Sequence, residues 1–242
     1  MSPPKTRSTE SSCSVAPSLG NNIEPHSSPA TPQQMFQLIK RRILEAKGPG
    51  YFEYQQIPPK TGQLVARRLS EDGDIERANP TLSYNTLDRV FSVTMSSATH
   101  GSACPWVSTE MIHSGRQGLF TMEEDKDLMK GGNDGFYNFP APWAAGSYKE
   151  PDVYIIHPAT FLPTVVIESG YYNESSTKLQ YDKDLWLLGG APHVNVVILI
   201  KWDKAADSNR VSGWIELHRR GDSGAAIHKI IICYMIYWLS IQ

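Results

Sequence analysis

The sequence has 242 residues, of which 40% are hydrophobic and 20% are charged. These values fit one ordinary soluble domain that buries a sizeable core, together with some additional tail. The 23 Lys and Arg residues and the 25 Asp and Glu residues give a net charge of −2, which excludes a strongly basic protein that attracts nucleic acid through its overall field.

The first segment, residues 1–32, is rich in Ser, Pro and Thr and has few side chains that could be buried. It is predicted to be a disordered tail, followed by a single domain over residues 33–242. The N-terminus has no apolar stretch of the kind found in a secretory signal, and Cys13, Cys104 and Cys233 are too widely spaced for a disulfide framework. We therefore expect an intracellular protein, cytoplasmic or nuclear.

An amphipathic helix is predicted over residues 33–47, because apolar residues recur at helical spacing and Gly48 follows as a stop signal. The helix carries three consecutive basic residues, Lys40, Arg41 and Arg42. Such a cluster is commonly a solvated helix face, and in the functional interpretation it contacts the phosphate backbone of a nucleic acid.

Two pairs of β-prone segments come next. Residues 51–57 and 63–69 are predicted to form a hairpin, because the Pro- and Gly-containing stretch 58–62 separates them. Residues 82–84 and 90–95 are predicted to form a second strand pair around a polar turn.

Residues 103–114 are predicted to form a helix, and residues 124–148, rich in Gly, Asn, Asp and Pro, a long loop. The apolar run at residues 230–241 is too short to span a bilayer and is predicted to be a terminal strand or a core helix. We expect no membrane partner, and no motif for a small-molecule cofactor is evident.

The clearest organisation lies between residues 147 and 203. A strand at residues 152–157 is followed by an apolar strand at 164–168, a helix at 175–188 and an apolar strand at 194–202. A strand–helix–strand unit of this length predicts a right-handed crossover between parallel strands. The predicted fold class is therefore mixed α/β.

Two acids mark the ends of these strands. Asp152 begins one strand and Glu168 ends the next, so a hairpin would bring both carboxylates to one place. Two neighbouring carboxylates repel each other unless a cation lies between them, and hard oxygen ligands suit Mg²⁺ or Mn²⁺. Solvated acids at strand ends are the alternative interpretation.

Pro151, Asp152 and Glu168 resemble the core of the restriction-endonuclease-like superfamily, written PD-(D/E)XK. There a Pro-Asp pair begins the second core strand, and an acid followed by x-Lys ends the third. The resemblance covers about residues 147–203 and is especially to a fungal branch in which acid-x-Gly replaces acid-x-Lys; residues 93–111 are weakly similar to the first core helix. It implies a central mixed sheet flanked by helices and a Mg²⁺- or Mn²⁺-dependent nuclease.

The sequence departs from this pattern after the second acid. Gly170 stands where the superfamily has lysine, so the strand supplies no cation to orient an attacking water. Lys178, on the following helix, is the best substitute and shares a helix face with Asp182, a further accessory candidate. A surface ion pair between them is the alternative, and Lys183 is a weaker candidate.

An acid on the first core helix often completes sites of this superfamily. This chain has Gly101 at the matching place, and Glu110 is the nearest acid that a helix could present. In an active enzyme, Asp152 and Glu168 would bind the metal and Lys178 would position the nucleophile. If the lysine and the helical acid are both lost, the chain is instead a catalytically inactive binding or scaffold module.

Two other patterns point to different chemistry. Residues 221–224, GDSG, resemble the nucleophile motif of serine proteases, and His100 precedes them as that order requires. The predicted parallel crossover has no place in that fold. His100, Cys104 and His113 could contribute zinc ligands, but no fourth ligand is evident.

Overall fold

The computed structural model describes residues 31–97, 100–170, 174–204, 211–221 and 227–234. The tail predicted to be disordered therefore lies almost entirely outside the described residues. The first helix, α1 (Pro32–Glu45), begins where Thr31 and Gln34 form a capping box. It buries Met35, Ile39 and Ile43, which confirms the predicted amphipathic helix.

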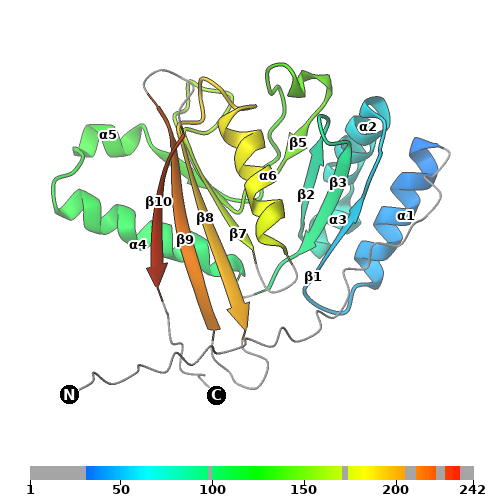
Figure 1. Cartoon of the computed structure of the whole chain (residues 1–242), viewed down its shortest axis with the longest axis horizontal. Coiled ribbons are helices and arrows are strands. Elements are labelled where there is room, and N and C mark those ends of the chain that lie inside the picture. The colour runs from blue at the N-terminus through cyan, green and yellow to red at the C-terminus, as the bar shows by residue number, and fades with distance from the viewer. Residues whose placement is uncertain (1–30, 98–99, 171–173, 205–210, 222–226, 235–242) are drawn as a thin grey trace, which may run out of the picture.

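Four antiparallel strands form the first sheet, which we call sheet A. In spatial order they are β1 (Gly50–Tyr54), β3 (Val90–Met95), β2 (Pro80–Asn85) and β5 (Tyr148–Lys149). The pairing of β2 with β3 confirms the second predicted strand pair. One face of sheet A packs against α1, α2 (Pro59–Ser70) and α3 (Gly73–Ala78), as Figure 1 shows.

The first predicted hairpin is wrong, because its second strand is the helix α2. Pro59 occupies the first turn of this helix. A backbone N–H at that position has no partner within the helix, so proline, which has no N–H, is well tolerated there. Gly62, Val65, Ala66 and Leu69 are buried on one side, at the spacing of a helix face rather than a strand. The prolines that suggest a turn between strands therefore begin a helix.

Six strands form the second sheet, sheet B. In spatial order they are β10 (Ile227–Tyr234), β9 (Val211–Arg220), β8 (Val196–Lys204), β7 (Val165–Gly170), β6 (Val153–Ile156) and β4 (Met129–Gly131). Only the β7–β8 pair is parallel among the described ladders, as the crossover through α6 (Ser176–Leu187) predicts. The mixed α/β class is confirmed, with two sheets in place of a single central one.

The helix α6 lies between the two sheets (Figure 1). Its apolar side packs on β7 and β8 through Leu179, Leu185 and Trp186. On the other face of sheet B, α4 (Ala103–Arg116) packs through Ala103 and Val107 and confirms the predicted helix.

The predicted loop at residues 124–148 contains short elements. They are the end of α5 (Met122–Lys126), then β4, the 3₁₀ helix η2 (Trp143–Ala145) and the first residue of β5. At the C-terminal end, β10 confirms a strand over the first part of the apolar run, whereas residues 235–242 lie outside the described residues. None of the described helices combines the length and the hydropathy that crossing a membrane requires.

A candidate acid and lysine site between the two sheets

Asp152 directly precedes β6, and Glu168 lies on the neighbouring strand β7. In the antiparallel pair of β6 and β7, Val153 faces Ile167, so the two acids adjoin the same end of this ladder. The Oδ2 atom of Asp152 accepts a hydrogen bond of 2.6 Å from the backbone N–H of Ser169. The structure therefore brings together the two acids that the sequence analysis selected.

The Glu168 carboxylate is buried beneath α6. Its Oε1 atom accepts a hydrogen bond of 2.5 Å from the indole Nε1 of Trp186 and lies 3.3 Å from Nζ of Lys149. Only 3% of Glu168 is exposed, and this burial raises the pKa of its carboxyl group to about 8. A strongly shifted pKa of this kind is common at functional sites.

The helix α6 supplies further charged groups. Ser175 caps its first turn, and Lys178 and Asp182 lie one turn apart, with 2.8 Å between Nζ and Oδ2. Lys178 Nζ is also 2.9 Å from Oε1 of Glu174. Lys178 and Asp182 form the ion pair of the alternative interpretation, but it is not on the surface: Asp182 is buried and Lys178 is largely covered, with side chains 9% and 14% exposed. Lys183 instead pairs with its neighbour Asp184.

Lys149 is the functional candidate that the sequence analysis missed. Its side chain is 1% exposed, and Nζ lies 3.3 Å from Glu168 Oε1 and 3.2 Å from Asp182 Oδ2. Burial by itself lowers the pKa of Lys149, but the facing carboxylates of Asp182 and Glu168 outweigh it and raise the pKa. Although burial raises the pKa of Asp182, Lys149 and Lys178 reverse that effect and hold it below the usual value.

No local signal in the sequence marks Lys149. It lies on the two-residue strand β5, which belongs to sheet A, whereas Glu168 belongs to sheet B. Only the packing of sheet A against α6 places the ammonium group beside the acids.

Carboxylates outnumber ammonium groups among the described residues of this site. We call it the acid–lysine cluster, and its members are Asp152, Glu168, Glu174, Asp182, Lys149 and Lys178. Its four carboxylates exceed its two ammonium groups, which leaves two surplus negative charges when all six are ionised. In a buried site such a surplus is relieved by protonation of a carboxyl group or by a bound cation.

Leu179 packs against Gly170, the position at which the PD-(D/E)XK pattern has a lysine. A Cβ atom on Gly170 would lie 2.9 Å from a methyl group of Leu179, so a longer side chain does not fit there without rearrangement. On the adjacent strand β8, Lys201 faces Gly170, but its Nζ donates to Asp203 and to the carbonyl of Trp202. Lys149 is therefore the ammonium group in direct contact with Glu168 within the described part of the chain.

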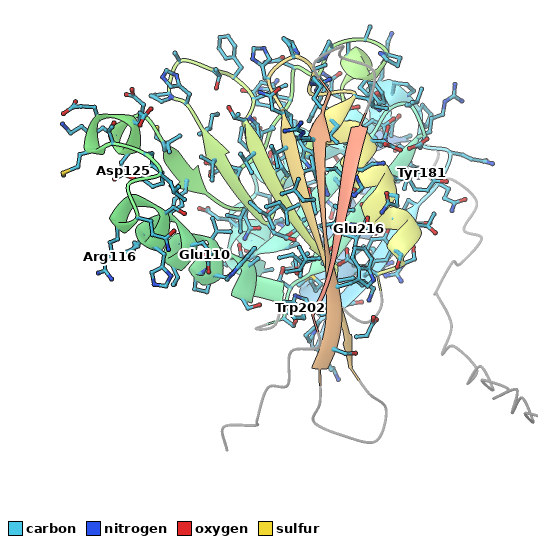
Figure 2. All side chains as sticks on the ribbon, turned by 60° about the vertical axis from the view of Figure 1, so that its left-hand side comes forward. Glu110, Arg116, Asp125, Tyr181, Trp202 and Glu216 are labelled. Carbon is cyan, nitrogen blue, oxygen red and sulfur yellow. The ribbon has the colours of Figure 1, made fainter. Side chains whose placement is uncertain are left out.

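Glu110 does not join the cluster. It is exposed on α4, on the opposite side of sheet B from Tyr181 of α6, as Figure 2 shows. The helix α4 packs against the side of β6 and β7 that carries Val153 and Ile167. Each of these two residues is next in the chain to one of the two acids. The structure thus gives no support to an accessory role for Glu110.

The predicted nucleic-acid contacts also lie elsewhere. Lys40 pairs with Asp72 and Asp74 at 2.7 Å, and the Arg42 guanidinium lies 4.4 Å from the centre of the Phe52 ring. Arg41 is exposed. All three residues are on α1, which covers the face of sheet A that points away from α6.

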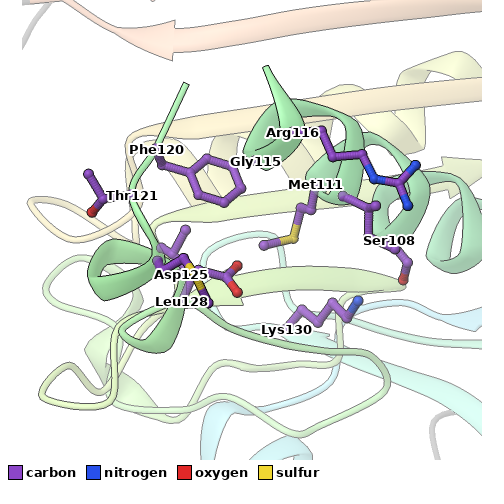
Figure 3. Close-up of a pocket in the computed structure, with 11 residues that line it drawn as sticks. Ser108, Met111, Gly115, Arg116, Phe120, Thr121, Asp125, Leu128 and Lys130 are labelled. Atoms are coloured by element: carbon purple, nitrogen blue, oxygen red, sulfur yellow. The ribbon is translucent and has the colours of Figure 1, made fainter. Parts of the chain in front are cut away.

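A cleft of about 390 Å³ opens beside the cluster, between sheet A and α6. Lys178 and Asp182 form part of its wall, and we call it the α6 cleft. A second pocket of about 470 Å³ lies between α4 and α5 (Figure 3) and is lined largely by apolar side chains such as Met111 and Phe120. None of the predicted catalytic or metal-binding residues lines the second pocket.

Comparisons with protein-family models, curated proteins and solved structures find no match to this chain. The resemblance to the PD-(D/E)XK superfamily remains a prediction. Among the described residues, which include Cys104 and His113, no three His, Cys, Asp or Glu side chains are arranged to hold a metal ion. Ser223 of the serine-protease alternative lies outside the described residues.

Proposed function

We propose that this chain hydrolyses nucleic-acid phosphodiesters with a divalent metal ion held by Asp152 and Glu168. The observation that carries the proposal is that these two carboxylates adjoin the same end of the β6–β7 ladder, where Asp152 accepts from the N–H of Ser169, the residue after Glu168. Mg²⁺ is commonly held by only one or two carboxylates, with water and substrate phosphates as its other ligands. The donor set of Asp152 and Glu168 fits that pattern.

The protein's own groups have distinct roles in this proposal. Trp186 orients Glu168, and the Ser169 N–H orients Asp152. When bound, the metal would neutralise the scissile phosphate and lower the pKa of the attacking water. Lys149, which is 3.3 Å from Glu168, would stabilise the negative charge that develops as water adds to phosphorus and the ester oxygen departs.

A noncatalytic binding or scaffold module is the second candidate. It is favoured by the contacts of Lys149, whose ammonium group already bridges Glu168 and Asp182 as a bound cation would. The basic residues of α1 also lie on the far side of sheet A, so they do not extend the surface around the acids.

Calorimetric titration with Mn²⁺ tests the proposal without knowledge of the substrate. We expect the wild-type protein to bind Mn²⁺ and the Asp152→Asn/Glu168→Gln variant to lose binding. The Glu123→Gln/Asp125→Asn variant is the matched control, because it removes two carboxylates from the first turn of the exposed helix α5. Circular dichroism of each variant checks that it is folded.

Hydrolysis assays separate the two candidate functions. Labelled single- and double-stranded DNA and RNA would be incubated with Mn²⁺ or Mg²⁺ and with wild type, Lys149→Met or Lys178→Ala. Metal-dependent cleavage that the Asp152→Asn/Glu168→Gln variant lacks supports the hydrolase. If wild type binds no Mn²⁺, alone or with an oligonucleotide, and cleaves none of these substrates, the hydrolase proposal is wrong and the noncatalytic module is favoured.

A further inference from the structure

The face of sheet A that points toward α6 is polar, which is unusual for a sheet face covered by a helix. Glu53, Ser92, Ser83 and Lys149 occupy directly facing positions on β1, β3, β2 and β5, so they form one row across the whole sheet. The opposite face of the same strands carries apolar side chains such as Phe91 and packs under α1 and α2. The α6 cleft lies over the polar row.

Two serine hydroxyl groups in this row make no hydrogen bond to any other described residue. Ser83 and Ser92 are each 6% exposed and both line the α6 cleft. Within the described residues, neither side-chain hydroxyl takes part in a hydrogen bond. Neither hydroxyl oxygen is among the fully buried, unsatisfied side-chain atoms of the described residues, so both reach the cleft, where they are available to hydrogen-bond a ligand that fills it.

The charged residues that line the cleft indicate the chemistry of that ligand. Glu53, Asp88 and Asp182 contribute carboxylates, and the ammonium group of Lys178 is already paired with Glu174 and Asp182. Anions would meet net negative charge here, whereas hydroxyl groups can donate to the carboxylates and accept from the serines.

Aromatic side chains border the same space. Tyr51 lines the cleft, its hydroxyl donates to Glu53, and its ring lies 5.3 Å from Lys178 Nζ. Tyr181, which is 56% exposed, lines the cleft from α6. The size of the cleft, about 390 Å³, lies in the range of small-molecule sites.

We propose that the α6 cleft binds a sugar ring, with Ser83 and Ser92 hydrogen-bonded to its hydroxyl groups and Tyr181 against its apolar face. This inference goes beyond the proposed hydrolase and does not depend on it, because it needs neither metal nor phosphate. The sugar could belong to a free saccharide or to a ribonucleoside, and the experiment distinguishes these sources.

Binding would be measured by saturation-transfer NMR and calorimetry in the presence of EDTA. The probes are D-glucose, N-acetyl-D-glucosamine, adenosine and 2′-deoxyadenosine, each at millimolar concentration. We expect at least one sugar probe to bind, and the Ser83→Ala/Ser92→Ala variant to bind it about tenfold more weakly or worse. The Ser108→Ala/Thr109→Ala variant on α4 is the matched control, since it also removes two hydroxyl groups.

Thermal stability gives a second readout. Because the hydroxyl groups of Ser83 and Ser92 are unpaired, their removal should leave the melting temperature unchanged or raise it. A free-saccharide site predicts binding of glucose or N-acetylglucosamine, and a ribonucleoside site predicts that adenosine binds more tightly than 2′-deoxyadenosine.

Four results would overturn the proposal. The first is that no probe binds to wild type, and the second is binding that the serine substitutions leave unchanged. The third is equal binding of the two nucleosides without binding of a saccharide. The fourth is a large loss of stability in the serine variant, because that would show a structural role for the hydroxyl groups.

Discussion

Lys149 is the residue on which the buried charges between the sheets depend. Its ammonium group contacts Glu168 and Asp182, and its side chain is 1% exposed. Removing one partner of a buried ion pair leaves the other charge without compensation, which costs far more than the loss of a surface pair. The effect on stability therefore separates this lysine from the exposed lysines of the chain.

At about pH 9, above the Glu168 pKa of about 8, we expect Lys149→Met to lower the free energy of unfolding by about 3–5 kcal/mol, measured by urea denaturation. In the double variant Lys149→Met/Glu168→Gln, neutralising Glu168 should recover part of the loss. As a control, Lys126→Met removes an exposed pair with Glu123 and should change stability by less than about 1 kcal/mol. A similar loss in both single variants would show that Lys149 contributes no buried ion pair.

Glu150 is a second buried acid, next to Lys149 but directed elsewhere. It accepts hydrogen bonds of 2.7 Å from the backbone N–H of Leu82 and 2.5 Å from the hydroxyl of Tyr148. Burial raises the pKa of Glu150 to about 7, although both hydrogen bonds favour the ionised form. As the pH rises, the unfolded chain therefore loses the proton of the Glu150 carboxyl group at a lower pH than the folded protein does.

This shift predicts a pH dependence of stability. The unfolded pKa is near 4.5 and the folded pKa is about 7, so this stabilising contribution is present below pH 4.5 and is lost as the pH rises through the folded value. As the pH rises from about 5.5 to about 8.5, the free energy of unfolding of Glu150→Gln should increase by about 2 kcal/mol relative to that of wild type. Urea denaturation at the two pH values measures this difference. An equal change in both proteins would contradict the raised pKa.

At the scale of elements, α2 and α6 show how packing selects structure. The helix α2 crosses β2 closely at Gly62, where an added Cβ atom would lie 2.2 Å from the Tyr84 ring. That ring is buried and its hydroxyl donates to the carbonyl of Ile57, so it is not free to move aside. The helix α6, in contact with both sheets, presents Leu179 to sheet B and carries Lys178 and Asp182 into the cleft.

The close crossing makes Gly62 sensitive to substitution. Gly62→Ala should destabilise the protein by about 1–3 kcal/mol, because the steric clash outweighs the gain in helix propensity. Gly73→Ala in α3 is the matched control, since its nearest neighbour is the flexible Arg77 at 3.8 Å. Thermal denaturation would measure both variants, and equal melting temperatures would show that α2 can shift away from β2.

At the scale of the whole molecule, the two sheets have separate apolar cores. Sheet A and helices α1–α3 enclose one, and sheet B packs against α6 on one face and α4 on the other. Polar contacts join the two halves, including Lys149 to Glu168 and Thr94 to Glu174. Cooperativity between the halves therefore depends strongly on buried polar groups.

We expect the two sheets of the wild-type protein to unfold together in urea and those of Lys149→Met to unfold at different concentrations. Tryptophan fluorescence reports on sheet B, where Trp202 and Trp214 lie on β8 and β9. Hydrogen exchange of β2 and β3 reports on sheet A. Coinciding midpoints in the variant would mean that other contacts maintain the coupling.

The sequence by itself determined the local elements whose periodicity matches their environment. Apolar spacing and a glycine stop signal predicted α1, and the strand–helix–strand pattern predicted α6 and the parallel pairing of β7 with β8. It also selected Asp152 and Glu168, since an acid at each end of a hairpin needs only local pairing to meet.

Only the tertiary structure decided the rest. It made α2 a helix, because burial of one face against sheet A overrode the interpretation of its prolines as a turn. It brought Lys149 from the other sheet to Glu168, and it placed Ser83 and Ser92 in the wall of the α6 cleft. Such contacts join residues far apart in the chain, and their energies depend on burial, which spacing in the sequence does not encode.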